Sequence, residues 1–272
     1  HKLRIRHAYA EVGNWTFGQA NSTFNTFVSL DTIISDTNDV FARQPLVRYS
    51  RNKGDWGYDV SLEQPETTLV DPDGNIVTPK DDKVPDLAAR VRYYPHWGEA
   101  SVSGLLSYLH QDRATIQSGG GDVVLGNSDS ATAWALNASG RIKVGDKDDI
   151  RFDMQYGEGL GRYLNYSTFA AGSVDTNGNI ELQTSYGGHL GYRHFWSEQL
   201  RSTLAYVYIA TDNNSGVATD VTKEMSQWTT NVMWSPATRM LVGLEYNKIE
   251  KELENGDKGD QDLLQMIWQY DF

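Results

Sequence analysis

Apolar and polar residues alternate with a period of two along almost the whole chain, and helical periodicity is scarce. The clearest case is the final segment, residues 264–272, in which every second residue is Leu, Met, Trp, Tyr or Phe. Repeated segments of about 10 residues with this alternation are typical of strands that face lipid on one side and a polar interior on the other. The pattern therefore predicts an all-β fold, a transmembrane antiparallel β-barrel.

We count thirteen segments of this kind, and each predicts one strand. They lie near residues 3–13, 15–24, 40–51, 56–65, 86–95, 99–112, 130–144, 148–160, 182–196, 199–210, 223–234, 238–250 and 261–272. Tight turns alternate throughout with long polar loops, as expected for a barrel whose short turns all lie at one end. The long loops are predicted at residues 24–40, 66–85, 113–130, 162–180, 211–222 and 251–260.

The odd number of strands is informative. The last strand follows a long loop, so it runs toward the periplasm, and counting back gives the first strand the same direction. A complete bacterial barrel has an even number of strands and both termini in the periplasm. We therefore expect residues 1–272 to form a single transmembrane domain that lacks an odd number of N-terminal strands.

The composition excludes several other classes of protein. The 24 Lys and Arg and 36 Asp and Glu give a net charge of −12, which argues against nucleic acid as a partner. The chain has no Cys, which excludes disulfides and thiolate metal sites. Its longest apolar run, Leu204 to Ala210, is far shorter than the roughly 20 residues of a membrane-spanning helix. The 15 Tyr and 8 Trp suit the interfaces of a membrane.

If the apolar face of each strand meets lipid, the opposite face carries an excess of basic residues. The inward positions include Arg4, Arg6, Arg48, Arg90, Arg92, Arg141, Lys143, Arg151, Arg193, Arg201 and Arg239. A basic lumen concentrates anions, and arginine binds carboxylates in a bidentate fork. This pattern predicts a lumen that binds small anions. Alternatively, these arginines pair with inward acids and hold the wall together.

The loop at residues 24–40 is unusually apolar for a polar connection, because Phe, Val, Leu and Ile are interspersed among its aspartates. A fully solvated surface loop would not carry this much apolar material. We therefore expect the loop to fold into the barrel and to constrict it, with Phe27, Asp31 and Asp36 near the narrowest point. The alternative is a surface loop at a contact between subunits.

The remaining motifs point to turns rather than to chemistry. Residues 70–76 and 174–180 share the pattern Val-Asp-x-Asp/Asn-Gly-Asn-Ile, which predicts two hairpin tips. Each lacks the closing Glu of an EF-hand loop, so no metal site is predicted. Nothing in the spacing points to a catalytic Ser–His–acid arrangement, and no cofactor is expected.

Three segments resemble the DcaP-like trimeric porins of Gram-negative outer membranes: LRIRHAY at residues 3–9, GQANSTF at 18–24 and RQPLVRY at 43–49. The strand pattern extends the resemblance to the whole chain. It implies a sixteen-stranded homotrimeric barrel that passes dicarboxylates and other small organic anions. In such barrels the inward loop follows the fifth strand. If 24–40 is that loop, about 13 strands are present here and about three N-terminal strands are missing.

The resemblance also sharpens the candidate site. It implies a basic wall that faces an acidic constriction loop, with Arg4, Arg6, Arg43 and Arg48 nearest to Asp31 and Asp36. Arg43 does not share the inward parity of Arg48. We therefore expect a bulge at Pro45, or the loop itself, to turn Arg43 inward.

Together these observations predict an integral outer-membrane porin that is not an enzyme and that allows passive diffusion of small organic anions. Its expected partners are anionic solutes, membrane lipid, lipopolysaccharide and two further copies of the chain. Two alternatives remain open. One is an outer-membrane barrel hydrolase with a site at the rim, and the other is a plugged structural or adhesive barrel that conducts nothing.

Overall fold

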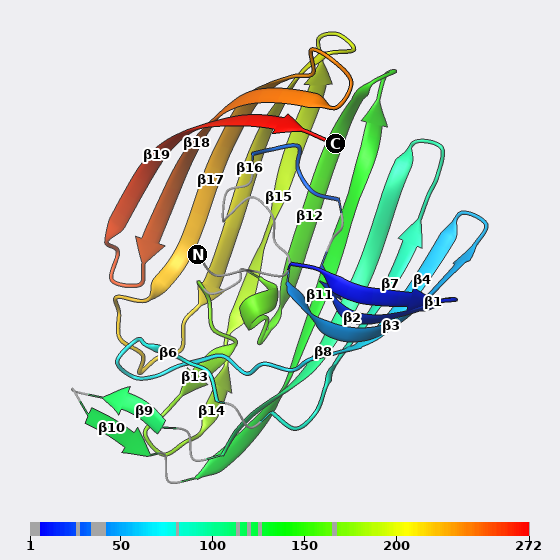
Figure 1. Ribbon diagram of the computed structural model, residues 1–272. Helices are drawn as coiled ribbons and strands as arrows, with labels where there is room; N and C mark the ends of the chain where they lie inside the picture. Colours follow the sequence, from blue (N-terminus) through cyan, green and yellow to red (C-terminus); the bar gives the residue numbers. More distant parts are fainter. Residues whose placement is uncertain are drawn as a thin grey trace.

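The computed structural model describes residues 6–25, 28–33, 42–79, 82–112, 115–118, 121–124, 127–164 and 168–271. Thirteen strands form one antiparallel sheet in chain order, which confirms the predicted fold class and strand count. They are β1 (Ala8–Val12), β2 (Trp15–Asn21), β3 (Arg43–Lys53), β4 (Trp56–Glu63), β7 (Asp86–Tyr93), β8 (Gly98–Asp112), β11 (Ser128–Val144), β12 (Asp148–Glu158), β15 (Thr184–Phe195), β16 (Leu200–Asp212), β17 (Thr222–Trp234), β18 (Met240–Leu253) and β19 (Lys258–Tyr270). The sheet is strongly curved, with β1 and β19 at its two edges (Figure 1).

The two faces of the sheet have the chemistry that the alternation predicts. In β4, Trp56, Tyr58, Val60 and Leu62 are exposed, while the residues between them are buried. Apart from the ends of β18 and β19, the exposed face of the sheet consists largely of apolar and aromatic side chains, whereas Asp, Glu, Arg, Asn and Gln gather on the concave face. Because successive side chains of a strand point to opposite faces, a polar interior and an apolar exterior follow directly from the sequence.

Helical structure is minimal in the part of the chain that the structure describes. It amounts to one 3₁₀ turn, η1 (Gly161–Tyr163). No helix within those residues is long and apolar enough to cross a membrane.

Tight turns join the strands at one end of the sheet, as predicted, but one connection at the other end differs from the prediction. Residues 251–260 are not a long loop, because β18 and β19 extend to Leu253 and Lys258 and are joined by four residues. The turn is closed by a 2.9 Å hydrogen bond from the Leu253 N–H to the carbonyl oxygen of Asp257. Gly256 adopts a φ of +87°, a conformation that glycine adopts without strain. The strands here are polar on both faces, so the apolar alternation that marks a strand is missing.

The two Val-Asp-x-Asp/Asn-Gly-Asn-Ile motifs form the hairpins that the sequence predicts, and the hairpins meet. Strands β5 (Leu69–Val70) and β6 (Ile76–Val77) flank the first turn, and β13 (Gly172–Val174) and β14 (Ile180–Leu182) flank the second. Together they form a four-stranded sheet in the order β14-β13-β5-β6, in which β13 runs parallel to β5. A third hairpin, β9 (Thr115–Ser118) with β10 (Gly121–Val124), lies at the same end of the molecule (Figure 1).

Each of the two repeated turns is built around one aspartate. The Asp175 carboxylate accepts hydrogen bonds from the backbone N–H of Asn177 at 2.9 Å and of Asn179 at 2.8 Å. Asp71 makes the equivalent contacts with Asp73 and Asn75. Burial alone would raise the pKa of the Asp175 carboxyl, but the N–H groups of Asn179 and Asn177 outweigh it and hold this pKa below its usual value.

Candidate functional site

The connection between β2 and β3 lies against the concave face of the sheet. Its two ends are closed by a 2.8 Å hydrogen bond from the Ser22 N–H to the carbonyl oxygen of Ala42. The Ala42 N–H in turn donates to Oδ1 of Asn25 at 2.9 Å. From this base the chain contacts the wall, since the Thr23 N–H donates to Oε1 of the buried Glu63 at 2.8 Å. Residues 22–25 and 42 therefore fold over the interior instead of leaving the end of the sheet.

Residues 28–33, which we call the strap, continue along the concave face as far as β17 and β18. Nδ2 of Asn231 donates to the carbonyl oxygen of Asp31 at 2.8 Å. The Ile33 N–H donates to Oε2 of Glu245 at 2.7 Å. A strap residue and a wall residue that lie more than 200 positions apart in the chain are thus joined.

Five charged side chains form a row beside the strap: Arg151, Asp149, Arg193, Asp31 and Arg201. Nε of Arg151 lies 2.8 Å from Oδ1 of Asp149, and Nε of Arg193 lies 3.1 Å from Oδ2 of the same carboxylate. Nη1 of Arg193 then lies 3.3 Å from Oδ2 of Asp31. On the far side, Arg201 reaches Asp31 through Nε at 2.5 Å and Nη2 at 3.2 Å. Three guanidinium groups thus alternate with two carboxylates.

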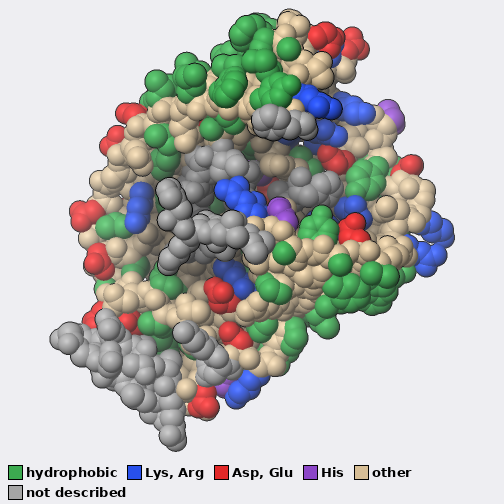
Figure 2. Space-filling view, viewed as in Figure 1, with side chains coloured by type: hydrophobic (Ala, Val, Ile, Leu, Met, Phe, Trp, Pro, Cys, Tyr) green, Lys and Arg blue, Asp and Glu red, His purple; other side chains and the backbone are tan. Residues whose placement is uncertain are grey.

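The pairing of neighbouring strands places four of these five side chains next to one another. Asp149 on β12 is paired directly with Arg193 on β15, so their side chains emerge side by side on the concave face. Arg201 follows on β16, the next strand. Asp31 is the only member that comes from the strap. The space-filling view shows basic and acidic side chains together in the hollow, while apolar side chains cover much of the outer rim (Figure 2).

A second connection also folds inward, which the sequence did not predict. After β12, residues 159–164 turn back into the curve of the sheet, where η1 lies (Figure 1). The Tyr163 hydroxyl donates to Oδ2 of Asp86 at 2.7 Å and accepts from Nε2 of Gln44 at 2.7 Å. Arg162 lies 3.0 Å from the same Asp86 carboxylate. Asn25 donates through Nδ2 to the carbonyl oxygen of Tyr163 at 2.9 Å, so the two inward connections bind each other.

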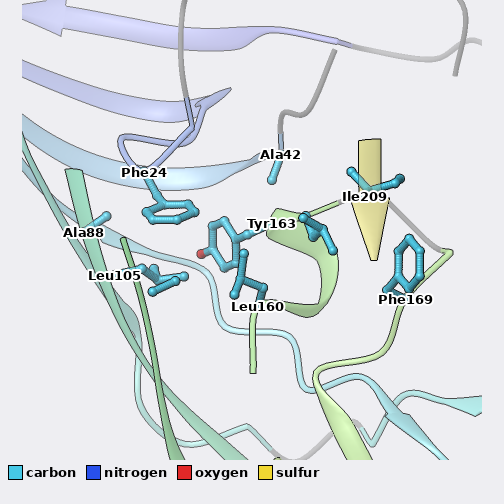
Figure 3. Close-up of a cluster of buried hydrophobic side chains, with 10 residues drawn as sticks. Phe24, Ala42, Ala88, Leu105, Leu160, Tyr163, Phe169 and Ile209 are labelled. Carbon is cyan, nitrogen blue, oxygen red and sulfur yellow. The ribbon is translucent and has the colours of Figure 1, made fainter. Parts of the chain in front are cut away.

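An apolar cluster fills the space between the two inward connections and the wall (Figure 3). The rings of Phe24 and Tyr163 meet edge to face, with centroids 5.7 Å apart. The cluster consists of Phe24, Ala42, Ala88, Leu105, Ala135, Leu160, Tyr163, Leu164, Phe169 and Ile209. The sequence carried a signal for this segment, because Leu160, Tyr163, Leu164 and Phe169 give it the apolar content that marked residues 24–40.

The family model of the DcaP outer membrane protein matches residues 1–272, the whole chain. The chain belongs to the DcaP outer membrane protein family. It is therefore an integral protein of the bacterial outer membrane, as the sequence predicts. A comparison with curated proteins gave no match.

Solved structures share the fold of this DcaP-family protein. It is similar to the outer membrane channel DcaP of Acinetobacter baumannii, with 24% identity and a TM-score of 0.83, over 99% of this chain and 75% of that chain. It is also similar to OmpT, an outer membrane protein of Vibrio cholerae, with 11% identity and a TM-score of 0.59, over 94% of this chain and 76% of that chain.

Other arginines of the predicted set are tied to the wall of the DcaP-family sheet. Arg90 and Arg92 on β7 both contact the carboxylate of Asp59 on β4, at 3.0 and 2.9 Å. Arg90 also donates to the carbonyl oxygen of Asn25 at 3.2 Å. Arg48 lies on the concave face of β3 and donates to the carbonyl oxygen of Asn21 at 3.3 Å.

Two more predicted residues lie near the tight turns. Arg141 on β11 is paired with Glu99 on β8, and Nε of Arg141 lies 3.0 Å from Oε1 of Glu99. Lys143 donates to the carbonyl oxygen of His96 at 3.4 Å. The sequence analysis did not assign Glu99, Asp149 or Asp86 to the concave face, although their strand parity matches that of the arginines beside them.

The expected bulge at Pro45, one of the two ways in which Arg43 was predicted to turn inward, is wrong. The register between β2 and β3 is continuous from Trp15 opposite Tyr49 to Asn21 opposite Arg43, so no bulge occurs at Pro45. Arg43 and Arg48 are five positions apart in a continuous strand, an odd offset, which gives their side chains opposite faces of the strand.

Five further predicted residues lie outside the concave wall or outside the described residues. Arg239 is exposed in the turn before β18, with a left-handed φ of 67°, so the strand parity used to place it does not apply. Arg6 is exposed ahead of β1, and its carbonyl oxygen accepts from Gln19 at 3.2 Å. Arg4, Phe27 and Asp36 lie outside the described residues.

Proposed function

We propose that this DcaP-family protein is an outer-membrane channel for the passive diffusion of small organic anions, with dicarboxylates as the preferred class. The observation that carries the proposal is the row of Arg151, Arg193 and Arg201, whose ion pairs within the described residues are made with two carboxylates, those of Asp149 and Asp31. The three arginine side chains are 14–19% exposed, so they remain in contact with water in the lumen. A net positive row between low-dielectric walls raises the local concentration of anions.

The two inward connections are the parts of the channel that would limit the size of a passing solute. The strap lies along β12 to β18, and residues 159–164 lie against β7 and β8 through Asp86 and the apolar cluster. Both connections reduce the free cross-section on the concave side. We therefore assign the constriction to the pair of connections, not to residues 24–40 alone.

The outward face supports the proposed lipid and subunit contacts. Aromatic side chains such as Trp56, Trp134 and Trp228 are exposed there, as is usual where a barrel meets the interfaces of a membrane. Lipid and lipopolysaccharide are the partners that this face fits, and a homotrimer is the proposed assembly. A trimer form is described for OmpT of Vibrio cholerae, whose fold is similar.

A plugged structural barrel is the second candidate, because one observation favours it. Asp59 is 2% exposed and its carboxylate contacts both Arg90 and Arg92, so these two arginines of the basic wall are engaged in ion pairs. A barrel in which all inward charges were paired in this way, with the apolar cluster across its interior, would not conduct.

The deciding experiment measures the zero-current potential of the purified protein in a planar bilayer under a potassium chloride gradient. We expect anion preference, and we expect Arg201→Gln to reduce it. The matched control is Arg141→Gln, whose guanidinium contacts Glu99 on β8 and is not part of the row. Cation preference would overturn the anion assignment, and absence of conductance would favour the plugged barrel. Turnover of ester substrates by the purified protein would support the hydrolase alternative.

A further inference from the structure

The carboxylate of Asp31 binds two of the three arginines that the proposed function assigns to the solute, Arg193 and Arg201. Arg201 contacts both of its oxygens, through Nε to Oδ2 at 2.5 Å and through Nη2 to Oδ1 at 3.2 Å. Arg193 adds a third contact at 3.3 Å. This is the fork geometry in which a guanidinium binds a free carboxylate. A carboxylate-binding site is therefore present, and a side chain of the same chain fills it.

Water in the lumen reaches both side chains of this ion pair, unlike those of the pair formed by Asp59 and Arg90. The Asp31 side chain is 17% exposed and that of Arg201 is 19% exposed. Asp59 and Arg90, by comparison, are 2% and 8% exposed. A solute carboxylate can approach the first pair without any rearrangement of the strands, whereas the second pair is enclosed.

The strap does not depend on the Asp31 carboxylate alone. Its backbone is held by Asn231, which donates to the carbonyl oxygen of Asp31 at 2.8 Å. It is also held by Glu245, which accepts from the Ile33 N–H at 2.7 Å. The side chain of Asp31 can therefore leave the guanidinium groups while the strap stays on the wall. Asp149 and Arg151 remain paired with each other when it does so, and the nearby Glu245 carboxylate still accepts from the Ile33 N–H.

We propose that Asp31 is a built-in competitor for the carboxylate of the solute. This inference rests on the proposed function and adds to it how solutes are released. An anion that enters the row displaces the Asp31 carboxylate from Arg193 and Arg201, and the return of Asp31 expels the anion. Conduction requires binding that is favourable enough for entry and weak enough for release. A carboxylate tethered to the strap keeps binding of the solute weak enough for release, because its local concentration beside the arginines is fixed and high.

The test uses succinate as the dicarboxylate probe and records single-channel blocking events in planar bilayers. In Asp31→Asn the arginine fork is open, so the mean residence time of succinate should lengthen by about tenfold, the loss of one charge-assisted competitor. Asp31→Glu keeps a carboxylate on the strap and should keep residence times close to those of the wild type. Glu99→Gln is the matched control, because it removes one inward negative charge that contacts Arg141 and not the strap.

The possible outcomes separate this inference from the proposed function. If the wild type shows no anion preference and no response to succinate, the proposed function fails. If the wild type binds succinate and Asp31→Asn has the same residence time, the competitor role is overturned. Equal lengthening in Asp31→Asn and Glu99→Gln would show a general charge effect and would also overturn it. Larger open-channel conductance in Asp31→Asn with unchanged residence times would mean that Asp31 only anchors the strap. Neutral succinamide should give no blocking events in any variant.

Discussion

Nδ2 of Asn25 donates a hydrogen bond of 2.9 Å to the carbonyl oxygen of Tyr163, a residue 138 positions later in the chain. This contact joins the connection after β2 to the connection after β12. Each connection is also attached to the wall, through Glu63 for the first and Asp86 for the second. The two therefore form one structure on the concave face, and a change in either should alter the space that both leave open.

Replacing Tyr163 by Ala should enlarge the lumen. The substitution removes a buried ring from the apolar cluster and the hydroxyl that links Gln44 to Asp86, at a local cost of about 3–5 kcal/mol. We expect a higher single-channel conductance. Tyr156→Ala is the control, because Tyr156 lies on the outward face. An unchanged conductance in Tyr163→Ala would place the cluster outside the conducting path.

Replacing Asp59 by Ala should destabilise the sheet. Its buried carboxylate lies 3.0 Å from Arg90 and 2.9 Å from Arg92, so the variant leaves two guanidinium groups without this counter-charge. The expected loss is about 3–5 kcal/mol, because a buried charge that loses its partner is poorly compensated. Refolding into detergent across a urea series measures this loss. Asp146→Ala, which alters an exposed turn, should leave the urea midpoint of unfolding unchanged. If the Asp59→Ala and Asp146→Ala variants unfold at the same urea midpoint, the prediction is wrong.

Single cysteines can test the two faces of the sheet, because the natural sequence has no Cys. Leu136 and Arg141 both lie on β11 but on opposite faces. In the membrane-embedded protein, Arg141→Cys should react with a charged, water-soluble thiol reagent, and Leu136→Cys should not, since lipid covers it. Rapid labelling of Leu136→Cys would reverse the assignment of the faces.

The turn around Asp175 should be insensitive to mild acid. Its folded-state pKa lies below the usual value of 3.8, so its contribution to stability is present above that value and is lost as the pH falls through the lowered pKa. We expect the backbone amides of Asn177 and Asn179 to stay protected from hydrogen exchange at pH 5. In Asp175→Ala the same amides should exchange faster at every pH. Equal protection in both proteins would rule out the Asp175 carboxylate as the group that holds this turn.

Much of the fold can be read from particular residues, because strand alternation is a local property. The alternating Trp56, Tyr58 and Val60 predict both the strand and the face of it that meets lipid. The same reasoning failed for residues 251–260, because on the face that would otherwise be apolar β18 carries Lys and Glu and β19 carries Lys and Asp. It also failed for Arg43, because a bulge was expected where the register is continuous.

The sequence by itself determined the strands, their faces and the inward position of most of the arginines, since a period of two needs only neighbouring residues. Tertiary structure alone decided which carboxylate each arginine meets. Asp31 reaches Arg201 from 170 residues away, and Asn25 reaches Tyr163 from 138. Such contacts depend on the path of a connection across the curved sheet. No local periodicity encodes that path, because it is set by where several distant strands place their side chains at once.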